Sequence, residues 1–310
     1  MITVERPAPL LTVQDRGRFG FLASGVTYSG PLDALALDVA NALVGNSSDA
    51  AALEGCLGGA QLRCERDLTF AVTGANVAVT CNAAVARTYV AHQARAGDTI
   101  TIDQAMQGAV WYIAFRGGVD VPVVLGSRST LLAAGLGGLS GGPLKPRAQL
   151  RIRDDTPRSP LGRDVPRELR SPLDDAPVPL APATRSDALD RGEWDRFYRT
   201  TYTISHSVSR VGYRLEGDPL PCRLPADIPS EPACAGAMQL PPQGHPIVLM
   251  ADFPTIGGYP VIGVVPSFAL GRLAQRAPGS PVRFTAITID EALAADQRQR
   301  EALSRWSNPG

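Results

Sequence analysis

The run Val110-Trp111-Tyr112-Ile113-Ala114-Phe115 decides the fold class, because it predicts a short strand of β-branched and aromatic residues that is followed by Gly117-Gly118. Similar short runs occupy residues 68–73, 77–80 and 99–102 before it, and residues 202–205, 246–250 and 282–288 after it. Gly, Asn, Asp and Pro bound these runs. Strands this short suit a barrel or a sandwich better than alternating strand–helix units. We therefore expect a mainly β fold with a few helices.

A proline-rich stretch separates the strands into two groups. Between residues 154 and 183 the chain mixes Arg, Asp and Ser with prolines at positions 157, 160, 166, 172, 177, 179 and 182. This composition predicts a linker or a long surface excursion. The predicted organisation is a first β domain over residues 1–153, a linker over 154–193, a second β domain over 194–290, and a C-terminal helix and tail over 291–310.

Boundary residues predict three helices. The first spans residues 33–44 and stops at Gly45. The second begins at Ser267 and ends before Pro278. The third extends from Asp290, its predicted N-cap, to about residue 306.

The charge balance excludes two classes of partner. The chain has 30 Lys+Arg and 30 Asp+Glu residues, a formal net charge of +0, and no long run of one sign. We therefore expect no nucleic-acid partner and no attraction to an anionic membrane. The opening residues lack the apolar core of a signal peptide, and no stretch is apolar enough to span a membrane, so we expect a cytoplasmic protein.

Lys145 is the only lysine, which limits the covalent chemistry of the chain. Its neighbours form neither a phosphate-binding Gly-Lys-Ser/Thr loop nor the Met-Lys-Met of biotin carriers. We therefore expect no covalent cofactor, biotin included, on this chain. The five cysteines form no C-x-x-C pair and argue against a disulfide framework, and the three isolated histidines predict no metal site.

Two segments combine glycines with charged side chains in the first half. Asp15 and Arg18 flank Gly17, and on spacing alone they favour a structural ion pair in a turn, although Arg18 could instead hold a carboxylate or a phosphate. Further on, Arg128 lies among small residues that allow a ligand to approach closely. The glycine-rich residues 135–142 that follow could form an anion nest or an ordinary loop.

A third segment lies in the second half. Asp252 follows the apolar run at 246–250, where a carboxylate would reach the rim of a sheet. Gly257 and Gly258 then present backbone, and Tyr259 adds a hydroxyl that can stabilise a developing oxyanion. Turn capping by Asp252 is the alternative interpretation.

These segments, taken together, resemble the biotin-dependent carboxyltransferase family. This family includes the C subunit of 5-oxoprolinase, the carboxyltransferase half of urea carboxylase and an antagonist of a sporulation kinase inhibitor, and is often labelled allophanate hydrolase subunit 2. The strings that carry the resemblance are V-Q-D-R-G-R, S-G-P-L-D-A-L-A, A-N-A-L-V-G-N, L-G-S-R-S-T, G-L-G-G-L, V-G-Y-R-L-E-G, Q-L-P-P-Q-G-H-P-I-V-L and T-I-G-G-Y-P. The resemblance covers nearly all of residues 2–295 except the proline-rich stretch.

The resemblance implies a fold, partners and a reaction. The implied fold is a pair of cyclophilin-like β-barrel domains that associate with a B-type sister subunit, and in the oxoprolinase system an A-type partner completes the reaction. The implied function is that of one subunit in an ATP-dependent 5-oxoprolinase, a hydrolase that opens a cyclic amide to glutamate. ATP enters only through the resemblance, and it could be bound by the partner or at the interface.

Two alternatives remain at this point. One is a carboxyltransferase subunit that moves a carboxyl group to urea, or to a related amide, from a biotin carried by another protein. The other is a non-enzymatic regulator that binds its sister subunit. The carboxyltransferase alternative fits the absence of a biotinylation site on this chain as well as the oxoprolinase function does.

The matched motifs also supply candidate site residues. The candidates for catalysis are Asp252, Tyr259 and Arg128, and the candidates for binding a small amide substrate are Asp15, Arg18, Ser127, Arg214, Gln239, Thr255, Gly257 and Gly258. In the implied roles, Arg128 and Arg18 bind a carboxylate or phosphate, Asp252 orients or deprotonates the amide, and Tyr259 stabilises charge. The chain departs from the family pattern at Pro254, where relatives usually have glutamine.

Overall fold

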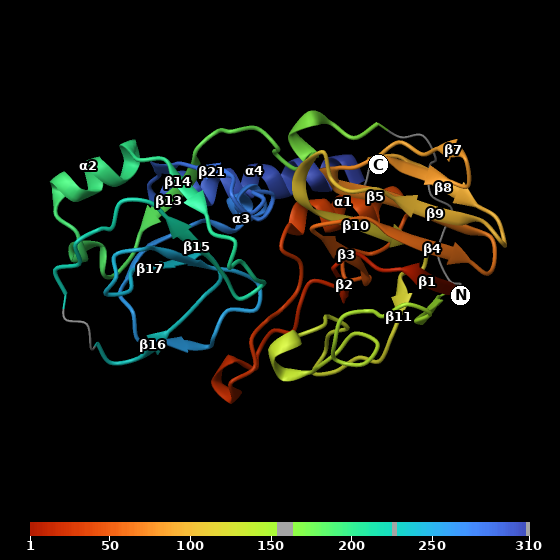
Figure 1. The fold of residues 1–310 in the computed structure, drawn as a ribbon, viewed down its shortest axis with the longest axis horizontal. Coiled ribbons are helices and arrows are strands. Elements are labelled where there is room, and N and C mark those ends of the chain that lie inside the picture. Colours follow the sequence, from red (N-terminus) through yellow and green to blue (C-terminus); the bar gives the residue numbers. More distant parts are fainter. Residues whose placement is uncertain (154–163, 225–227, 308–310) are drawn as a thin grey trace.

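The computed structural model describes residues 1–153, 164–224 and 228–307. Figure 1 shows two β bodies side by side, with the amino-terminal half of the chain in one body and the carboxy-terminal half in the other. The structure is mainly β with four α-helices in the part that it describes.

Two sheets form the first body. Its strands are β1 Ile2–Arg6, β2 Leu10–Gln14, β3 Ala52–Cys56, β4 Ala60–Cys64, β5 Leu68–Asn76, β6 Val79–Cys81, β7 Ala84–Val85, β8 Ala91–Ala94, β9 Thr99–Ile102, β10 Gln107–Phe115, β11 Val119–Asp120 and β12 Gln149–Ile152. The seven-stranded sheet has the order β11-β12-β1-β4-β9-β6-β7, and the five-stranded sheet has the order β2-β3-β10-β5-β8. The strand predicted at residues 110–115 is confirmed as part of β10, which pairs antiparallel with β3 and β5 at the centre of the second of these sheets.

The core of the first body lies between these sheets. It contains Val4, Leu62, Phe70 and Trp111, all fully buried. The Trp111 ring fills the space where a side chain at Gly55 would lie, because a Cβ there would come within 2.1 Å of the ring. Burying these large apolar groups against each other is the main force that holds the two sheets together.

The second body is built on one eight-stranded sheet and a two-stranded ribbon. Its strands are β13 Val178–Pro182, β14 Tyr202–Ile204, β15 Gly212–Glu216, β16 Glu231–Pro232, β17 Ala237–Gln239, β18 Ile247–Leu249, β19 Ile256–Gly257, β20 Val261–Val264, β21 Pro281–Val282 and β22 Phe284–Ala286. The large sheet has the order β21-β14-β15-β18-β17-β20-β13-β22, and β16 pairs with β19. The run predicted at 282–288 is therefore split between two strands, one at each edge of the sheet.

The predicted linker over residues 154–193 is wrong in its second half. Residues 178–182 form β13, which pairs antiparallel with β20 and parallel with β22. Within β13, Pro179 is partly buried and Pro182 at the strand end is exposed, whereas Val178, Leu180 and Ala181 are buried in the core. Residues 154–163 lie outside the described part of the chain.

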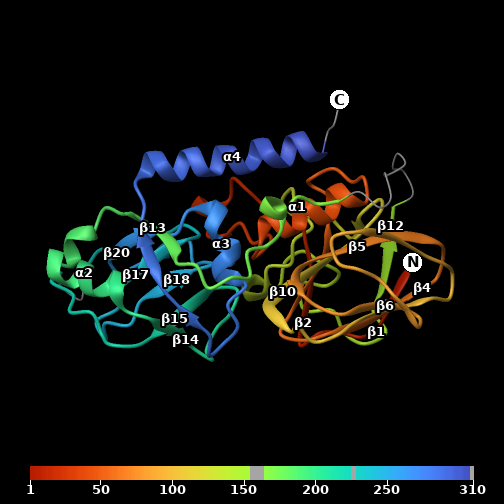
Figure 2. The same cartoon turned by 90° about the horizontal axis from the view of Figure 1, so that it is seen from above.

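Four helices cover the bodies in the described ranges. They are α1 Ala34–Leu43, α2 Arg191–Arg199, α3 Ser267–Ala274 and α4 Ile289–Ser307. The three predicted helices are confirmed, and the additional helix α2 begins inside the predicted linker with Asp190 as its N-cap. Figure 2 shows α4 lying across the outside of both bodies, and it contacts α1 of the first body and α3 of the second.

The predicted cap of the last helix is wrong. Asp290 lies inside α4, and the capping residue is Thr288, whose hydroxyl accepts a hydrogen bond from the Glu291 amide at 3.2 Å. The Glu291 carboxylate in turn accepts from the Thr288 amide at 2.9 Å. This reciprocal pair is a capping box, and it satisfies two amide groups that the first turn leaves free.

One apolar cluster joins the two bodies. It includes Leu37 of α1 and Tyr112 of β10, together with Leu215 and Met238 of the second body. The side chain of Gln275 reinforces this contact, because it hydrogen bonds to β10 like a neighbouring strand. Its oxygen accepts from the amides of residues 109 and 110, and its nitrogen donates to the carbonyl of residue 110. The bodies therefore share a core and pack as one unit.

No helix in the described ranges is both long and apolar enough to cross a bilayer. The described residues also contain no group of three or more His, Cys, Asp or Glu side chains arranged to hold a metal ion.

Candidate functional site

Asp15 organises the loops at one edge of the first body. Its carboxylate accepts hydrogen bonds from the hydroxyls of Ser127 at 2.5 Å and Ser129 at 2.6 Å. It also accepts from the backbone amides of Gly17 at 2.9 Å and Arg128 at 2.5 Å. The predicted residues Asp15 and Ser127 therefore meet, although 112 positions separate them in the sequence. Four donors on one buried carboxylate fix the loop after β2 against the loop before residue 130.

Arg18 lies under these loops and is almost fully buried. It is 1% exposed, its Nη2 donates to the Ser129 carbonyl, and its Nε lies 3.5 Å from the Val124 carbonyl. Its Nη1 has no hydrogen-bond partner among the residues that the structure describes. Burial lowers the pKa of Arg18, and the neighbouring carboxylates of Asp15 and Asp252 offset part of that shift. The expected ion pair between Asp15 and Arg18 does not form within 4 Å among the described residues.

The structure separates the side chain of Arg128 from the other candidates. Its backbone amide binds Asp15, but its guanidinium donates to the Val121 carbonyl at 3.1 Å and lies 4.0 Å from Asp120. The side chain thus supports the loop between β11 and β12. The glycine-rich residues that follow use amides internally, as Gly138 donates to the Arg128 carbonyl and Gly141 to the carbonyl of residue 137. These two amides are therefore not free to bind an anion.

A buried ion-pair triad lies where the two bodies meet. Arg210 binds the Asp252 carboxylate through two nitrogens, at 3.0 and 3.1 Å, and binds Glu54 of β3 through its third nitrogen. All three side chains are at most 2% exposed. Burial alone would lower the pKa of Arg210, but Glu54 and Asp252 together raise it above its ordinary value. Asp252 lies beyond the end of β18, and its carboxylate is buried at the junction of the two bodies.

Glu54 is held by partners from the first body as well. It accepts from the Leu32 amide at 2.9 Å and from the Tyr112 hydroxyl at 2.6 Å. Burial, and then the charge of Glu54, raise the pKa of Tyr112 well above its ordinary value, so the phenol stays protonated and donates to the carboxylate. Every charge of the triad thus has a partner, as buried charges require.

Continuous contacts link the Asp15 loops to this triad. Arg210 also donates to the Gly30 carbonyl at 2.5 Å, and the adjacent Ser29 hydroxyl donates to the Thr130 carbonyl at 2.8 Å. On the same side, the Tyr28 ring packs edge-on against Phe253, with ring centroids 5.5 Å apart. Two loops of the first body and the segment after β18 therefore form one site at the junction of the two bodies.

The remaining candidates lie in the second body. Gln239 is 5% exposed, and its amide nitrogen lies where a side chain at Gly257 would go, so these two residues meet. Thr255 contributes its carbonyl, which accepts from the Ala233 amide at 3.1 Å.

Apart from Asp252, the other candidates of the second body are more accessible than Gln239. Gly258 is partly buried, Tyr259 is 41% exposed, and Arg214 is exposed on β15. The hydrogen bonds and ion pairs of Asp252 within the described residues run to Arg210 and do not include Arg214 or Tyr259. The structure therefore does not bring these two candidates into direct contact with Asp252.

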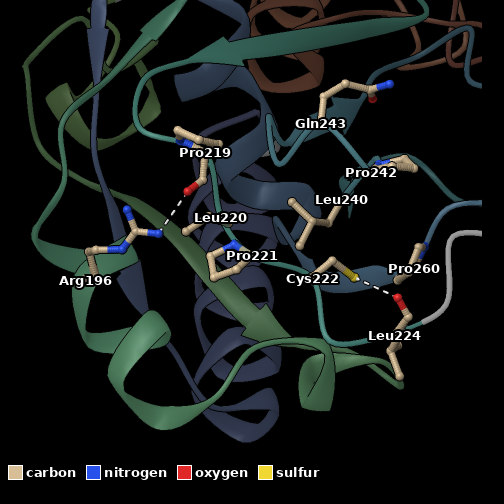
Figure 3. A pocket seen from close by; sticks show the side chains of 10 residues that line it. All are labelled: Arg196, Pro219, Leu220, Pro221, Cys222, Leu224, Leu240, Pro242, Gln243 and Pro260. Atoms are coloured by element: carbon tan, nitrogen blue, oxygen red, sulfur yellow. Dashed lines mark hydrogen bonds between the residues drawn. The ribbon is translucent and has the colours of Figure 1, made fainter.

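A pocket of about 610 Å³ opens in the second body (Figure 3). Figure 3 shows prolines and leucines around it, the Arg196 guanidinium donating to the Pro219 carbonyl at 2.9 Å, and Cys222 beside Leu224. None of the predicted site residues is among those that line it, although residues 240 and 260 are each next in sequence to a candidate. The pocket is thus distinct from the Asp15–Asp252 site.

Comparison with known proteins identifies the family. Residues 24–286 match the family described as "Carboxyltransferase domain, subdomain A and B". The chain belongs to this carboxyltransferase family. The matched range includes most of both bodies and the junction between them.

Two bacterial members of the carboxyltransferase family are similar over nearly the whole chain. The C subunit of 5-oxoprolinase from Escherichia coli is 36% identical over 305 residues, which is 97% of this chain and 96% of that protein. The protein of the same name from Haemophilus influenzae is 36% identical over 287 residues, 91% of this chain and 89% of that one.

Eukaryotic relatives contain the carboxyltransferase domain as part of a longer protein. Urea amidolyase of Lachancea kluyveri is 28% identical and matches 97% of this chain, but this chain spans only 18% of it. The crystal structure of Kluyveromyces lactis urea carboxylase superposes with a TM-score of 0.92 at 25% identity, covering 98% of this chain and 29% of the other. The fold is therefore that of a carboxyltransferase domain.

Sequence reasoning misses the two residues that complete the junction of this carboxyltransferase domain. Arg210 directly precedes the V-G-Y-R-L-E-G string that contains Arg214, but the sequence alone does not distinguish the buried arginine from the exposed one. Glu54 has no motif of its own. One signal is present in the sequence: Glu54 stands in the apolar run at residues 51–55, and a carboxylate in a buried strand requires a cationic or hydrogen-bonding partner.

Proposed function

We propose that this chain is the C subunit of an ATP-dependent 5-oxoprolinase, which acts with a B-type subunit to activate 5-oxoproline for ring opening to glutamate. The observation that carries the proposal is the end-to-end match to the C subunit of the Escherichia coli enzyme, 97% of this chain against 96% of that protein. A match of this extent includes both bodies and the site between them. An A-type subunit is proposed to complete the hydrolysis.

The site supports roles for its residues in this reaction. Asp252 has both carboxylate oxygens bound by Arg210, so we assign it to orient the amide of the substrate rather than to remove its proton. Tyr259 is 41% exposed, and we assign its hydroxyl to stabilise charge on the lactam oxygen. We assign substrate binding in the second body to Gln239, Thr255, Gly257 and Gly258.

Carboxyl transfer is the second candidate function. The specific observation in its favour is the TM-score of 0.92 to Kluyveromyces lactis urea carboxylase. In that case a carrier on another protein would supply the carboxybiotin. The third possibility, a regulator that only binds its sister subunit, predicts no turnover at all.

Product analysis separates these functions. The chain is combined with its B-type and A-type subunits, ATP and 5-oxoproline, and glutamate is measured over time. The proposal predicts ATP-dependent glutamate formation that requires this chain. A parallel reaction contains urea, bicarbonate, ATP and a biotin carboxylase with its carrier, and carboxylated urea in place of glutamate would favour carboxyl transfer.

A further inference from the structure

The Glu54 carboxylate is fixed in one orientation by the first body. The Tyr112 hydroxyl and the Leu32 amide both donate to its Oε2, at 2.6 and 2.9 Å, which leaves Oε1 to accept from the Arg210 guanidinium. Tyr112 is fixed in turn, because its hydroxyl accepts from the Asp33 amide at 2.9 Å and donates to the carboxylate. The first body therefore sets the direction from which Arg210 is bound.

Arg210 extends this fixed geometry to two separate loops. Its Nε and Nη2 donate to the two oxygens of Asp252 at 3.1 and 3.0 Å, and Nη2 also donates to the Gly30 carbonyl at 2.5 Å. Its Nη1 binds Glu54, so each nitrogen of the guanidinium is engaged. Because the guanidinium is planar and its donors form a rigid fork, it cannot turn away from Glu54 without loss of the contact to Asp252 or to Gly30.

Both of these loops carry candidate site residues. Asp252 begins the segment that ends at Tyr259, and Gly30 lies in the loop that begins after Asp15. Ser29 and Gly30 have φ angles of 55° and 86°, in the left-handed region that a residue with a side chain rarely adopts. Strained backbone of this kind persists only where the surrounding contacts hold it, and it occurs often at functional sites.

Stability alone does not account for three charged groups at this junction. Removal of charges from water is costly, and apolar side chains of similar volume often hold a buried position equally well or better. The shared core around the triad is apolar and includes Leu37, Leu215 and Met238. Apolar contacts hold the two bodies together without fixing a direction, whereas two parallel hydrogen bonds between a guanidinium and a carboxylate permit one arrangement.

We propose that Tyr112 and Glu54 are positioning residues of the site, which act through Arg210 to orient the Asp252 carboxylate for the substrate amide. The inference rests on the proposed function, which assigns Asp252 to that amide. Neither Tyr112 nor Glu54 contacts the substrate itself. A carboxylate of the second body is thus oriented by side chains of the first body, and the site is complete only when the two bodies are packed together.

The test compares two tyrosines that each bury one hydroxyl at the junction. The Tyr112 hydroxyl donates to Glu54, whereas the Tyr213 hydroxyl donates to the backbone carbonyl of Ala274 at 3.2 Å. ATP hydrolysis by the complex with the B-type subunit is measured with 5-oxoproline for wild type, Tyr112→Phe, Tyr213→Phe and Glu54→Gln. Because Y112F and Y213F each remove one buried hydroxyl, a general loss of packing would affect both.

We expect Y112F to lower the 5-oxoproline-dependent kcat by roughly 10- to 100-fold, the value of one hydrogen bond to a charged group, with an unchanged KM for 5-oxoproline and for ATP. E54Q lowers kcat at least as much, since it removes the charge that holds Arg210. Y213F keeps the wild-type kcat. The double variant of Y112F with Asp252→Asn is no slower than D252N alone, because Tyr112 acts through Asp252.

Several outcomes overturn the proposal. One is an equal kcat of Y112F and Y213F in assembled complexes, and another is full additivity of Y112F with D252N. If Y112F does not fold, E54Q decides in its place, because a wild-type kcat in an assembled E54Q complex excludes the positioning role. Failure of both variants to fold would assign these contacts to stability alone and would also overturn the proposal.

Failure of the proposed function gives a different result, because the wild-type complex then shows no stimulation of ATP hydrolysis by 5-oxoproline. The orientation of Asp252 is then tested without turnover, by crystal structures of the full chain as wild type, Y112F and Y213F. The proposal predicts that both contacts from Arg210 to Asp252 remain in Y213F and that at least one is lost in Y112F. An Asp252 carboxylate in the same position in both variants refutes it.

Discussion

Buried charge is balanced residue by residue at the junction of the two bodies. Arg210 neutralises Glu54 from the first body and Asp252 from the second, and all three side chains are at most 2% exposed. Replacement of Arg210 by Met would leave two carboxylates buried without a cation. Loss of one partner from a buried pair costs about 3–5 kcal/mol.

We therefore expect Arg210→Met to lower the free energy of unfolding by about 3–5 kcal/mol, as measured by urea denaturation at neutral pH. The matched control is Arg214→Met on β15, an exposed position where the change stays within about 0.5 kcal/mol. Equal stability of the two variants would show that Arg210 does not balance the junction.

At the scale of single residues, the sequence predicts some contacts and misses others. Asp15 and Ser127 belong to separate motifs and lie in hydrogen-bond contact. Arg128 is a candidate because of its side chain but joins the site through its backbone amide, since its guanidinium binds the Val121 carbonyl. Motif spacing cannot show which way a side chain points, and it cannot pair Glu54 with Arg210 across 156 positions.

At the scale of elements, the stability of the helices depends on the residues that cap them and on the charged side chains that they bury. On α1, Asp38 binds Arg16 at 2.7 Å, and it lines a cavity of about 710 Å³ between α1, α3 and α4. Burial raises the pKa of Asp38 from 3.8 to about 6, although Arg16 opposes this shift. The folded protein therefore binds more protons than the unfolded chain between about pH 4 and pH 6.

The sign of the pH dependence follows from this pKa. Because the folded-state pKa is the higher one, the contribution of Asp38 to stability is largest below about pH 4 and is lost as the pH rises to about 6, by at most about 3 kcal/mol. We expect Asp38→Asn to remove this loss. Chemical denaturation of both proteins across about pH 4–7 tests it, and parallel curves for wild type and D38N would contradict it.

The capping box of α4 gives a second prediction for an element. Thr288→Ala removes the hydroxyl that accepts from the Glu291 amide, and the loss of an N-cap costs about 1 kcal/mol. We expect faster hydrogen exchange in the first turns of α4 and little change elsewhere. Asp290→Ala is the matched control, since Thr288 and not Asp290 caps the helix. Exchange that is slower in T288A than in D290A would be the contrary result.

The strands and three helices are predictable because periodicity, glycines and prolines mark them locally. Two features are not. β13 lies in a proline-rich stretch whose composition suggests a linker, and it becomes a strand because β20 and β22 provide partners on both sides. The predicted cap of α4 lies two residues too late, because Asp290 and Thr288 are both good capping residues and only the hydrogen bonds distinguish them.

In the whole molecule, the two bodies work as one unit because they share an apolar core, the Gln275 contact to β10 and the Arg210 triad. The two-body organisation and the family are accessible from the sequence. The junction is not, since it depends on pairs of residues that are far apart in the chain. The site lies at this junction, so we expect activity to require both bodies together with the sister subunit.

The most direct test of this account is ATP hydrolysis by the complex of this chain with its B-type partner, with and without 5-oxoproline, for wild type and Asp252→Asn. The account predicts that 5-oxoproline stimulates the wild-type complex and that D252N assembles with the partner but loses the stimulation by about 100-fold or more. Equal stimulation of both complexes, or none in the wild type, would contradict it.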